Sequence, residues 1–266
     1  MNILKRSLAP ITDKAWEEIE LQSERVIKEF TTGRRFADIN GPLGLEYGAA
    51  STGRLIIPPD QPAEGIRYGI REVVPLVEVR KNFSLDLWEL DNASRNAKDI
   101  DLEELEEAAR QVASFEDNCL YHGFGETNAP GLLKGASRKP AKFPPNAEAF
   151  MKTLLEMIAS LKQEAVEGPY ALVIPDPVWR QMAGESSAYP LAARLRETTG
   201  GPVIMHHSNE EVFVVSQRGG DIELVLGQDI SLGYEVHDRE KVDLYFTASF
   251  TWRILAPEAF RVMIPG

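Results

Sequence analysis

Cysteine is scarce in this sequence, and its scarcity restricts the chemistry the chain can carry. Cys119 is the single cysteine among 266 residues, which excludes an internal disulfide and a zinc site built from cysteines. The sequence therefore sets no requirement for an oxidising compartment. Cys119 lies on the apolar face of a predicted helix, where a thiol is typically inert, so we expect no nucleophilic role for it.

Histidine is scarce as well, and the four histidines do not follow a metal-binding pattern. His206 and His207 are adjacent, so on a strand they point to opposite faces and cannot chelate together. His237 is followed by an acid, but no pair of histidines four residues apart supports a helical zinc site. We therefore expect no metal ion.

Basic residues are outnumbered by acidic ones: 29 Lys and Arg stand against 41 Asp and Glu, a net charge of -12. Phosphate binding needs a cationic field and no long basic run exists, so nucleic acid is not an expected partner. No apolar run approaches the length of a membrane span. The first residues, MNILKRSLAPITDKAWEE, have no apolar stretch typical of a secretory signal. These absences predict a soluble cytoplasmic protein without a membrane partner.

Catalytic motifs are also missing. The sequence has no G-x-S-x-G elbow and no P-loop, and HGFGETN lacks the third glycine of a dinucleotide loop and follows a helix instead of a strand. The acid-rich segment DNASRNAKDIDLEE has no glycine at the sixth position of a calcium-binding loop. We therefore expect no enzyme activity.

What the sequence does contain is a mixture of strong helical and strand patterns, which predicts an α+β fold. Apolar residues at helical spacing predict long helices at 12–32, 102–122 and 146–167, the first with Thr12 as its N-cap. Unbroken alternation over 242–254 predicts a long, half-buried strand. The segment 125–146 is rich in Gly, Pro and Lys, and we expect a domain boundary there.

Residues 51–91 are expected to be extended. From Val77 to Leu87 apolar and polar side chains alternate over about eleven positions, which at about 3.3 Å per residue span about 36 Å. That length exceeds a usual strand. It favours an arm that leaves its own domain.

Three further segments have alternative interpretations. In RGGDIELVLGQDISLGYE, residues 218–235, the RGG is expected to be a hairpin turn, and the following glycines are expected to bend the chain. On an extended segment Trp88 shares the polar face with Arg80, so it is predicted either to stack on a flat aromatic ligand, to lock a subunit contact, or to pack against its own chain. GESSAYP, residues 184–190, is either a plain surface loop or a loop at a symmetry axis.

Seven short motifs together resemble one family. They are LKRSLAPIT followed by AWEEI, GRRFADINGPLGLEYGA, FSLDLWELD, EGPYALVI, YPL, RGGDIELVLGQDISLGYE and FTASFTWRIL. In this order and spacing they resemble the encapsulins, bacterial and archaeal shell proteins that are similar to the tailed-phage major capsid protein. Each motif alone is weak, but seven in register are specific. The resemblance covers nearly the whole chain and is weakest at 134–146.

The resemblance implies a tailed-phage major-capsid-like fold with a peripheral domain, an extended arm loop and an apical domain. The peripheral domain would comprise 1–50 with the N-terminal helix, 83–129 with a spine helix, and 227–266. The arm would be 51–82 and the apical domain 130–226. It also implies a non-enzymatic subunit that assembles with itself into an icosahedral shell of about sixty copies or a small multiple.

The resemblance further implies a cargo. The shell would enclose a ferritin-like protein or a dye-decolorising peroxidase that carries a C-terminal docking peptide, in iron storage or oxidative-stress defence. The matching positions for the docked peptide are Ile27, Phe30, Arg34, Asp38, Ile39, Ile230 and Tyr234. Phe30 and Ile39 have an alternative role, which is to pack the helix against the sheet. The matching positions for a five-fold pore are Glu185, Ser186, Ser187, Ala188 and Tyr189, whose small polar groups predict little charge selection.

Three other functions stay open. No cofactor is required, but some similar shells stack a flavin such as FMN on the residue that matches Trp88, with Arg80 nearby; this is an interpretation of binding, without turnover. A hydrolase is a weaker alternative, because no Ser-His or metal constellation supports it. A phage capsid protein shares the fold, but no head-maturation segment is expected ahead of Met1.

Overall fold

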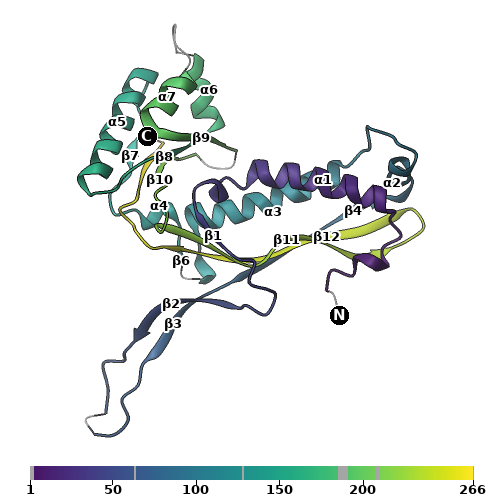
Figure 1. The fold of residues 1–266 in the computed structure, drawn as a ribbon, viewed down its shortest axis with the longest axis horizontal. Helices are drawn as coiled ribbons and strands as arrows, with labels where there is room; N and C mark the ends of the chain where they lie inside the picture. Colours follow the sequence, from purple (N-terminus) through teal and green to yellow (C-terminus); the bar gives the residue numbers. More distant parts are fainter. Residues whose placement is uncertain (1–2, 63, 128, 185–190, 208–209, 266) are drawn as a thin grey trace.

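Two long helices lie together over one face of a four-stranded sheet (Figure 1). The computed structural model describes residues 3–62, 64–127, 129–184, 191–207 and 210–265. The helices are α1 (Asp13–Phe30) and α3 (Glu103–His122), and the sheet has the order β1-β11-β12-β4. Its strands are β1 (Asp38–Asn40), β4 (Val77–Asp86), β11 (Ile222–His237) and β12 (Lys241–Ile254).

The ends of the two helices follow from local sequence. The hydroxyl of Thr12 accepts the N–H of Ala15 at 3.3 Å, which confirms Thr12 as the predicted N-cap of α1. Gly123 ends α3 with φ of 85°, a backbone conformation that favours glycine. The apolar stripes of α1 and α3 then meet the inner face of the sheet, where Ile19, Leu105 and Phe246 are fully buried.

A second sheet of five strands, in the order β7-β13-β10-β8-β9, forms a separate layer (Figure 1). Its strands are β7 (Ala141–Lys142), β8 (Tyr170–Pro175), β9 (Gly200–His206), β10 (Val212–Ser216) and β13 (Phe260–Ile264), and the helices α5 (Ala147–Gln163), α6 (Asp176–Gly184) and α7 (Leu191–Thr199) pack on it. β8 is buried along its whole length, as expected for a central strand. The end of β12 and the end of α3 pack on the other face of this sheet through Trp252, Tyr121 and Phe213.

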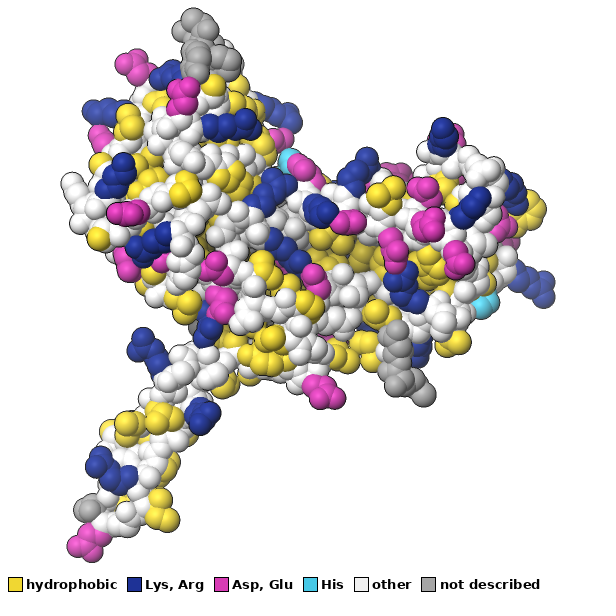
Figure 2. Space-filling view, in the orientation of Figure 1, with side chains coloured by type: hydrophobic (Ala, Val, Ile, Leu, Met, Phe, Trp, Pro, Cys, Tyr) yellow, Lys and Arg dark blue, Asp and Glu magenta, His cyan; other side chains and the backbone are white. Residues whose placement is uncertain are grey.

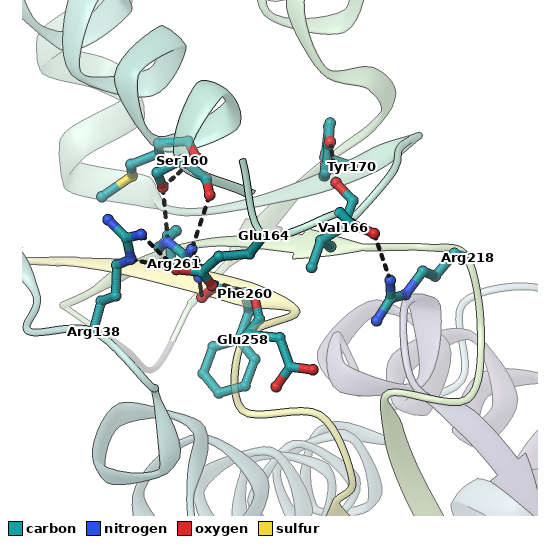
Figure 3. A network of polar contacts seen from close by, with 11 residues as sticks. Arg138, Ser160, Glu164, Val166, Tyr170, Arg218, Glu258, Phe260 and Arg261 are labelled. Carbon is teal, nitrogen blue, oxygen red and sulfur yellow. Dashed lines mark hydrogen bonds and ion pairs between the residues drawn. The ribbon is translucent and has the colours of Figure 1, made fainter. Parts of the chain in front are cut away.

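The C-terminal strand β13 belongs to the second sheet, between β7 and β10. The segment 227–266, expected to be the third part of the peripheral domain, therefore contributes most of β11 and all of β12 to the first sheet and β13 to the second. A buried arginine explains the placement, because Arg261 donates from Nε to the hydroxyl of Ser160 and from Nη2 to Glu164, each at 2.8 Å (Figure 3). Its Nη1 donates to the carbonyls of Glu258 and Phe260, so the guanidinium joins β13 and the residues just before it to the C-terminal end of α5.

The turn at RGG does not form the hairpin predicted from its sequence. Gly219 and Gly220 have φ of 81° and 79°, which confirms a tight turn. The strands on its two sides, however, belong to different sheets, with β10 in the second and β11 in the first. The hairpin prediction is therefore wrong, because each strand pairs with neighbours distant in sequence: β10 with β8 and β13, and β11 with β1 and β12.

The arm is a two-stranded ribbon, β2 (Ala49–Ile56) with β3 (Ile70–Pro75), that projects away from both sheets (Figure 1). Along it, Leu55, Ile56, Ile57, Ile66 and Ile70 each leave more than half of their surface exposed. Figure 2 shows hydrophobic side chains along the ribbon, beside scattered Lys and Arg. So much exposed apolar surface on a segment without a core indicates a protein contact.

The arm is shorter than the sequence predicts. β4 pairs with β12 over its whole length, from Val77 opposite Phe250 to Asp86 opposite Lys241. Residues 77–82 therefore belong to the first sheet and not to the arm. The alternation that predicted an arm arises because one face of β4 packs against α3.

The remaining elements are short. They are η1 (Arg6–Leu8), η2 (Gly33–Arg35), α2 (Leu87–Ser94), β5 (Gly123–Phe124), η3 (Gly125–Thr127), β6 (Ala129–Pro130) and α4 (Leu132–Gly135). Within the described ranges no helix combines the length and the apolar character that crossing a bilayer requires. The same part of the chain holds no group of three or more potential metal ligands.

Candidate functional site

A groove of about 510 Å³ lies between α1 and the middle of β11. Figure 2 shows hydrophobic side chains below α1, with acidic and basic side chains on the rim. The lining comes from three places: the N-terminal segment, α1 with η2, and β11. The residues are Leu4, Arg6, Glu20, Ser23, Glu24, Ile27, Lys28, Arg34, Asp229, Ile230, Ser231 and Leu232.

α1 presents Ile27 to the groove because its buried stripe faces elsewhere. Ala15, Ile19 and Val26 point into the core, Ser23 is buried at the border of the groove, and Ile27, next to Val26, is half-buried. The Ser23 hydroxyl donates to the carbonyl of Ile19 at 2.6 Å, so its polarity is satisfied within the helix. The α1 wall of the groove is therefore apolar at its centre and charged at its edges.

β11 carries a bulge where it borders the groove. Its register with β12 shifts between Gln228 and Ser231, so Asp229 and Ile230 have no direct partner on β12. The carboxylate of Asp229 accepts the N–H of Ile230 at 2.7 Å, which stabilises the irregular backbone. The bulge turns both side chains toward α1.

Arg34 stands at one end of the groove in a network of two carboxylates. Its Nε and Nη2 donate to the two oxygens of Glu116 at 2.6 and 2.7 Å, and its Nη1 lies 2.8 Å from Asp229. Glu116 is only 2% exposed. Burial raises the pKa of Glu116, and the bidentate contact with Arg34 offsets part of that rise. Burial alone would lower the pKa of Arg34, but Glu116 and Asp229 raise it, so the guanidinium stays charged.

The next acid along α3, Asp117, fixes the backbone that carries Arg34. Its carboxylate accepts the N–H groups of Thr32 and Gly33 at 2.8 and 3.0 Å, and Nε2 of His206 lies 3.3 Å away. A side chain at Gly33 would meet Leu120 at 2.4 Å, so close approach of η2 to α3 requires glycine. Two consecutive acids of α3 therefore place the guanidinium at the groove.

The N-terminal segment closes the other end of the groove. The N–H of Tyr234 donates to the carbonyl of Leu4, and the Tyr245 hydroxyl donates to the carbonyl of Ile3, both at 2.8 Å. Arg6 forms an ion pair with Glu20 and lies 4.3 Å over the ring of Trp16. These contacts hold residues 3–6 against β11, β12 and α1.

The structure brings three of the predicted docking residues together: Ile27, Arg34 and Ile230 line the groove. Phe30 lies at the end of α1 against the ring of His207, with ring centroids 4.9 Å apart. Tyr234 is buried in the core below, and its hydroxyl lies 2.6 Å from Nδ1 of His237. Their roles in docking stay predictions.

Asp38 and Ile39 lie on β1, outside the residues that line the groove. The carboxylate of Asp38 accepts the N–H of Gly220 at 2.6 Å, so it stabilises the RGG turn. Ile39 pairs in register with Leu224 and is 43% exposed. The predicted pore residues Glu185, Ser186, Ser187, Ala188 and Tyr189 fall outside the described residues.

Trp88 and Arg80 do not share an extended segment. β4 ends at Asp86, whose side chain caps α2 by accepting the N–H of Glu89 at 3.0 Å, and Trp88 lies on that helix, 74% exposed. The guanidinium of Arg80 lies 4.1 Å over the ring of Tyr245. The prediction that both side chains share one face of a strand is therefore wrong, because the Asp86 cap starts a helix between them.

Sequence reasoning missed Glu116, Asp117 and the residues of the N-terminal segment. A signal for the two acids was present, since Glu116 and Asp117 fall between apolar residues of the best predicted helix, in the stretch ASFEDNCLY. A buried acid needs a partner of opposite charge, and the two arginines that follow α1, Arg34 and Arg35, are candidates for that partner.

Comparison with known proteins agrees with the fold. Residues 1–251 match the family described as encapsulating protein for peroxidase. The type 1 encapsulin shell protein of Mycolicibacterium paratuberculosis is 34% identical over 260 residues, which are 97% of this chain and 98% of that protein. A virus-like particle from Pyrococcus furiosus matches with a TM-score of 0.60 at 18% identity, over 91% of this chain and 98% of that one.

A tailed-phage capsid shares the same fold. The capsid of Myoviridae phage XM1 matches with a TM-score of 0.55 at 13% identity, over 88% of this chain and 90% of that one. At this identity the likeness concerns the fold alone. Together with the mixed helices and sheets, it confirms the predicted tailed-phage major-capsid-like class.

Proposed function

The chain belongs to the encapsulin shell-protein family, and from this premise we propose that it assembles with itself into a closed icosahedral shell around a cargo enzyme. The observation that carries the proposal is the arm. Its exposed Leu55, Ile56, Ile57, Ile66 and Ile70 lie far from any core of their own subunit, so a neighbouring copy is the surface that suits them. The shell is proposed to be cytoplasmic and its subunit to act as structure, without catalysis.

The arrangement of the chain supports the parts assigned by resemblance. The first sheet with α1 and α3 would be the peripheral domain, with α3 as the spine helix, and the second sheet with α5, α6 and α7 would be the apical domain. α6 ends at Gly184 and α7 begins at Leu191. The proposal that Glu185–Tyr189 ring a five-fold pore rests on the resemblance alone.

The cargo is proposed to bind through a tail peptide in the groove between α1 and β11. The apolar centre at Ile27 and Ile230 suits a Leu or Ile side chain, and the Arg34 and Asp229 pair offers partners for polar groups. The family description favours a peroxidase as cargo. A ferritin-like protein is the second cargo class, and iron storage or oxidative-stress defence would follow from whichever is enclosed.

Co-expression with a peroxidase or a ferritin-like enzyme that carries a C-terminal docking tail tests the docking proposal. We expect the enzyme to co-elute with shells in the void volume of gel filtration, and deletion of its C-terminal tail to abolish co-elution. Ile27→Asp with Ile230→Asp should lower loading at least tenfold, because a charge cannot be solvated against an apolar peptide side chain. The matched control is Leu21→Asp, an exposed residue of α1 outside the groove, which should load normally. Loading that survives both tail deletion and the double substitution would contradict the proposal.

Flavin binding is a second candidate, favoured by one observation. Trp88 leaves 74% of its surface exposed, which suits an indole that stacks on a flat ring. Because Arg80 rests on Tyr245 of the same subunit, the candidate site reduces to Trp88. Purified shells would be yellow, with absorbance near 450 nm that Trp88→Ala removes; colourless shells after incubation with FMN would exclude it.

A further inference from the structure

Among the residues that the structure describes, the edge of β11 that faces away from β12 is paired at its two ends and not between them. β12 follows one edge of β11 along most of its length. On the other edge, β1 pairs with residues 223–225, and Leu43 and Gly44 donate to the carbonyls of Leu226 and Gly227 at 2.9 and 2.8 Å. Further along, Leu4 accepts the N–H of Tyr234. Among the described residues, no backbone hydrogen bond reaches this edge between Gln228 and Gly233.

The alternation of an antiparallel ladder shows which groups face this gap. The N–H of Tyr234 points away from β12, so Tyr234 and Leu244 form a non-hydrogen-bonded pair. The register is unbroken from Ser231 to Tyr234, so Leu232, two residues earlier, has the same orientation opposite Phe246. The main-chain N–H and C=O of Leu232 therefore point outward, and Leu232 is one of the residues that line the groove.

The side chains around the gap leave room for the backbone of an added segment beside Leu232. The Leu232 side chain is buried in the core, so it does not fill the groove. Asp229 is held by Arg34 and by the N–H of Ile230, at the β1 end of the gap. Six residues from Gln228 to Gly233 correspond to about 20 Å of strand, enough for a segment of about five residues.

We propose that the groove binds its peptide by strand addition: a short extended segment of the cargo tail occupies the vacant position beside β11 and pairs with the backbone of Leu232. The inference rests on the proposed function for the identity of the occupant and adds the mode of binding. Because the same strand position is filled on both sides of the gap, by residues 38–44 and by Leu4, the segment completes an existing ladder. Alternate side chains of the segment then face Ile27.

Two consequences distinguish strand addition from docking by side chains alone. The amide of Leu232 gains a hydrogen-bond partner when cargo is bound, so its hydrogen exchange slows. Only every second residue of the tail directs its N–H toward β11. Methylation of those nitrogens weakens binding, whereas methylation of the nitrogens between them has little effect.

Hydrogen exchange on cargo-loaded shells tests the first consequence, with shells co-expressed with the tail-deleted enzyme as the reference. We expect exchange at Leu232 to slow at least tenfold on loading, while the amide of Tyr234, already bonded to Leu4, changes little. Loaded shells with unchanged exchange at Leu232 would overturn strand addition and leave the proposed function intact. Shells that never load cargo would overturn both.

Synthetic copies of the same enzyme's tail, N-methylated at one position at a time, test the second consequence. Binding to empty shells is expected to weaken about tenfold at alternate positions, the loss of one backbone hydrogen bond together with the bulk of the methyl group. Equal binding of all methylated tails would overturn the proposal.

Discussion

Replacing Ile56, Ile66 and Ile70 with serine is expected to prevent shell assembly and leave small soluble oligomers or monomers. These side chains are 54%, 86% and 58% exposed, and the ribbon that carries them has no core of its own. Covering them by a neighbour would contribute roughly 3–6 kcal/mol per subunit, a hundredfold or more in affinity at each contact. Light scattering after gel filtration measures the change in mass.

A matched substitution separates this effect from a general loss of surface hydrophobicity. Leu21 on α1 and Leu155 on α5 are 64% and 55% exposed, similar to the arm residues, but they lie on helices packed against a core. The double variant Leu21→Ser with Leu155→Ser should assemble with the yield of the unmodified chain. Full assembly of the arm variant would contradict the role assigned to the ribbon.

Glu116→Ala is expected to destabilise the subunit by about 3–5 kcal/mol, because it leaves the mostly buried Arg34 charge without its bidentate partner. A loss of that size lowers the melting temperature by roughly 10 °C, which differential scanning calorimetry measures. Cargo loading should fall as well, since Arg34 stands at the end of the groove.

The control removes both charges together. Arg34→Met with Glu116→Leu replaces the pair by apolar side chains of similar size, and such replacements are often close to neutral. We expect this double variant to melt well above Glu116→Ala while still loading less cargo than the unmodified chain. Equal melting temperatures for Glu116→Ala and the unmodified protein would show that the pair carries no net energy.

The elements predicted best from the sequence are those with long, regular patterns. The spans expected for the three long helices, 12–32, 102–122 and 146–167, correspond to α1, α3 and α5 within a few residues, and the alternation at 242–254 corresponds to β12. In each case local preference and burial agree, because one face of the element meets a core along its whole length.

The elements predicted worst are those whose structure is determined by contacts between residues distant in the sequence or by a single capping residue. Alternation through LDLWEL predicted a strand past Trp88, but the Asp86 cap begins α2. RGG predicted a hairpin, but its flanking strands pack in different sheets. Residues 77–82 were predicted to belong to the arm because no feature of the neighbouring sequence indicates that β12 pairs with them.

The groove was predictable only in part. Ile27, Arg34 and Ile230 were placed by resemblance, and the structure brings them together. The groove also depends on the β11 bulge and on the contacts of Arg34 with Glu116 and Asp229, which lie about 80 and about 200 positions further along the chain. Contacts between residues so far apart in the sequence cannot be predicted from local sequence patterns.

Cryo-electron microscopy of the purified, unmodified chain tests most directly whether a second copy covers the arm. The expected result is a closed icosahedral particle of about sixty copies of the 29.6 kDa chain, about 1.8 MDa, or a small multiple. In it, residues 49–75 should lie on an adjacent subunit. A monomer at micromolar concentration, with this ribbon packed on its own sheets, would contradict the central claim.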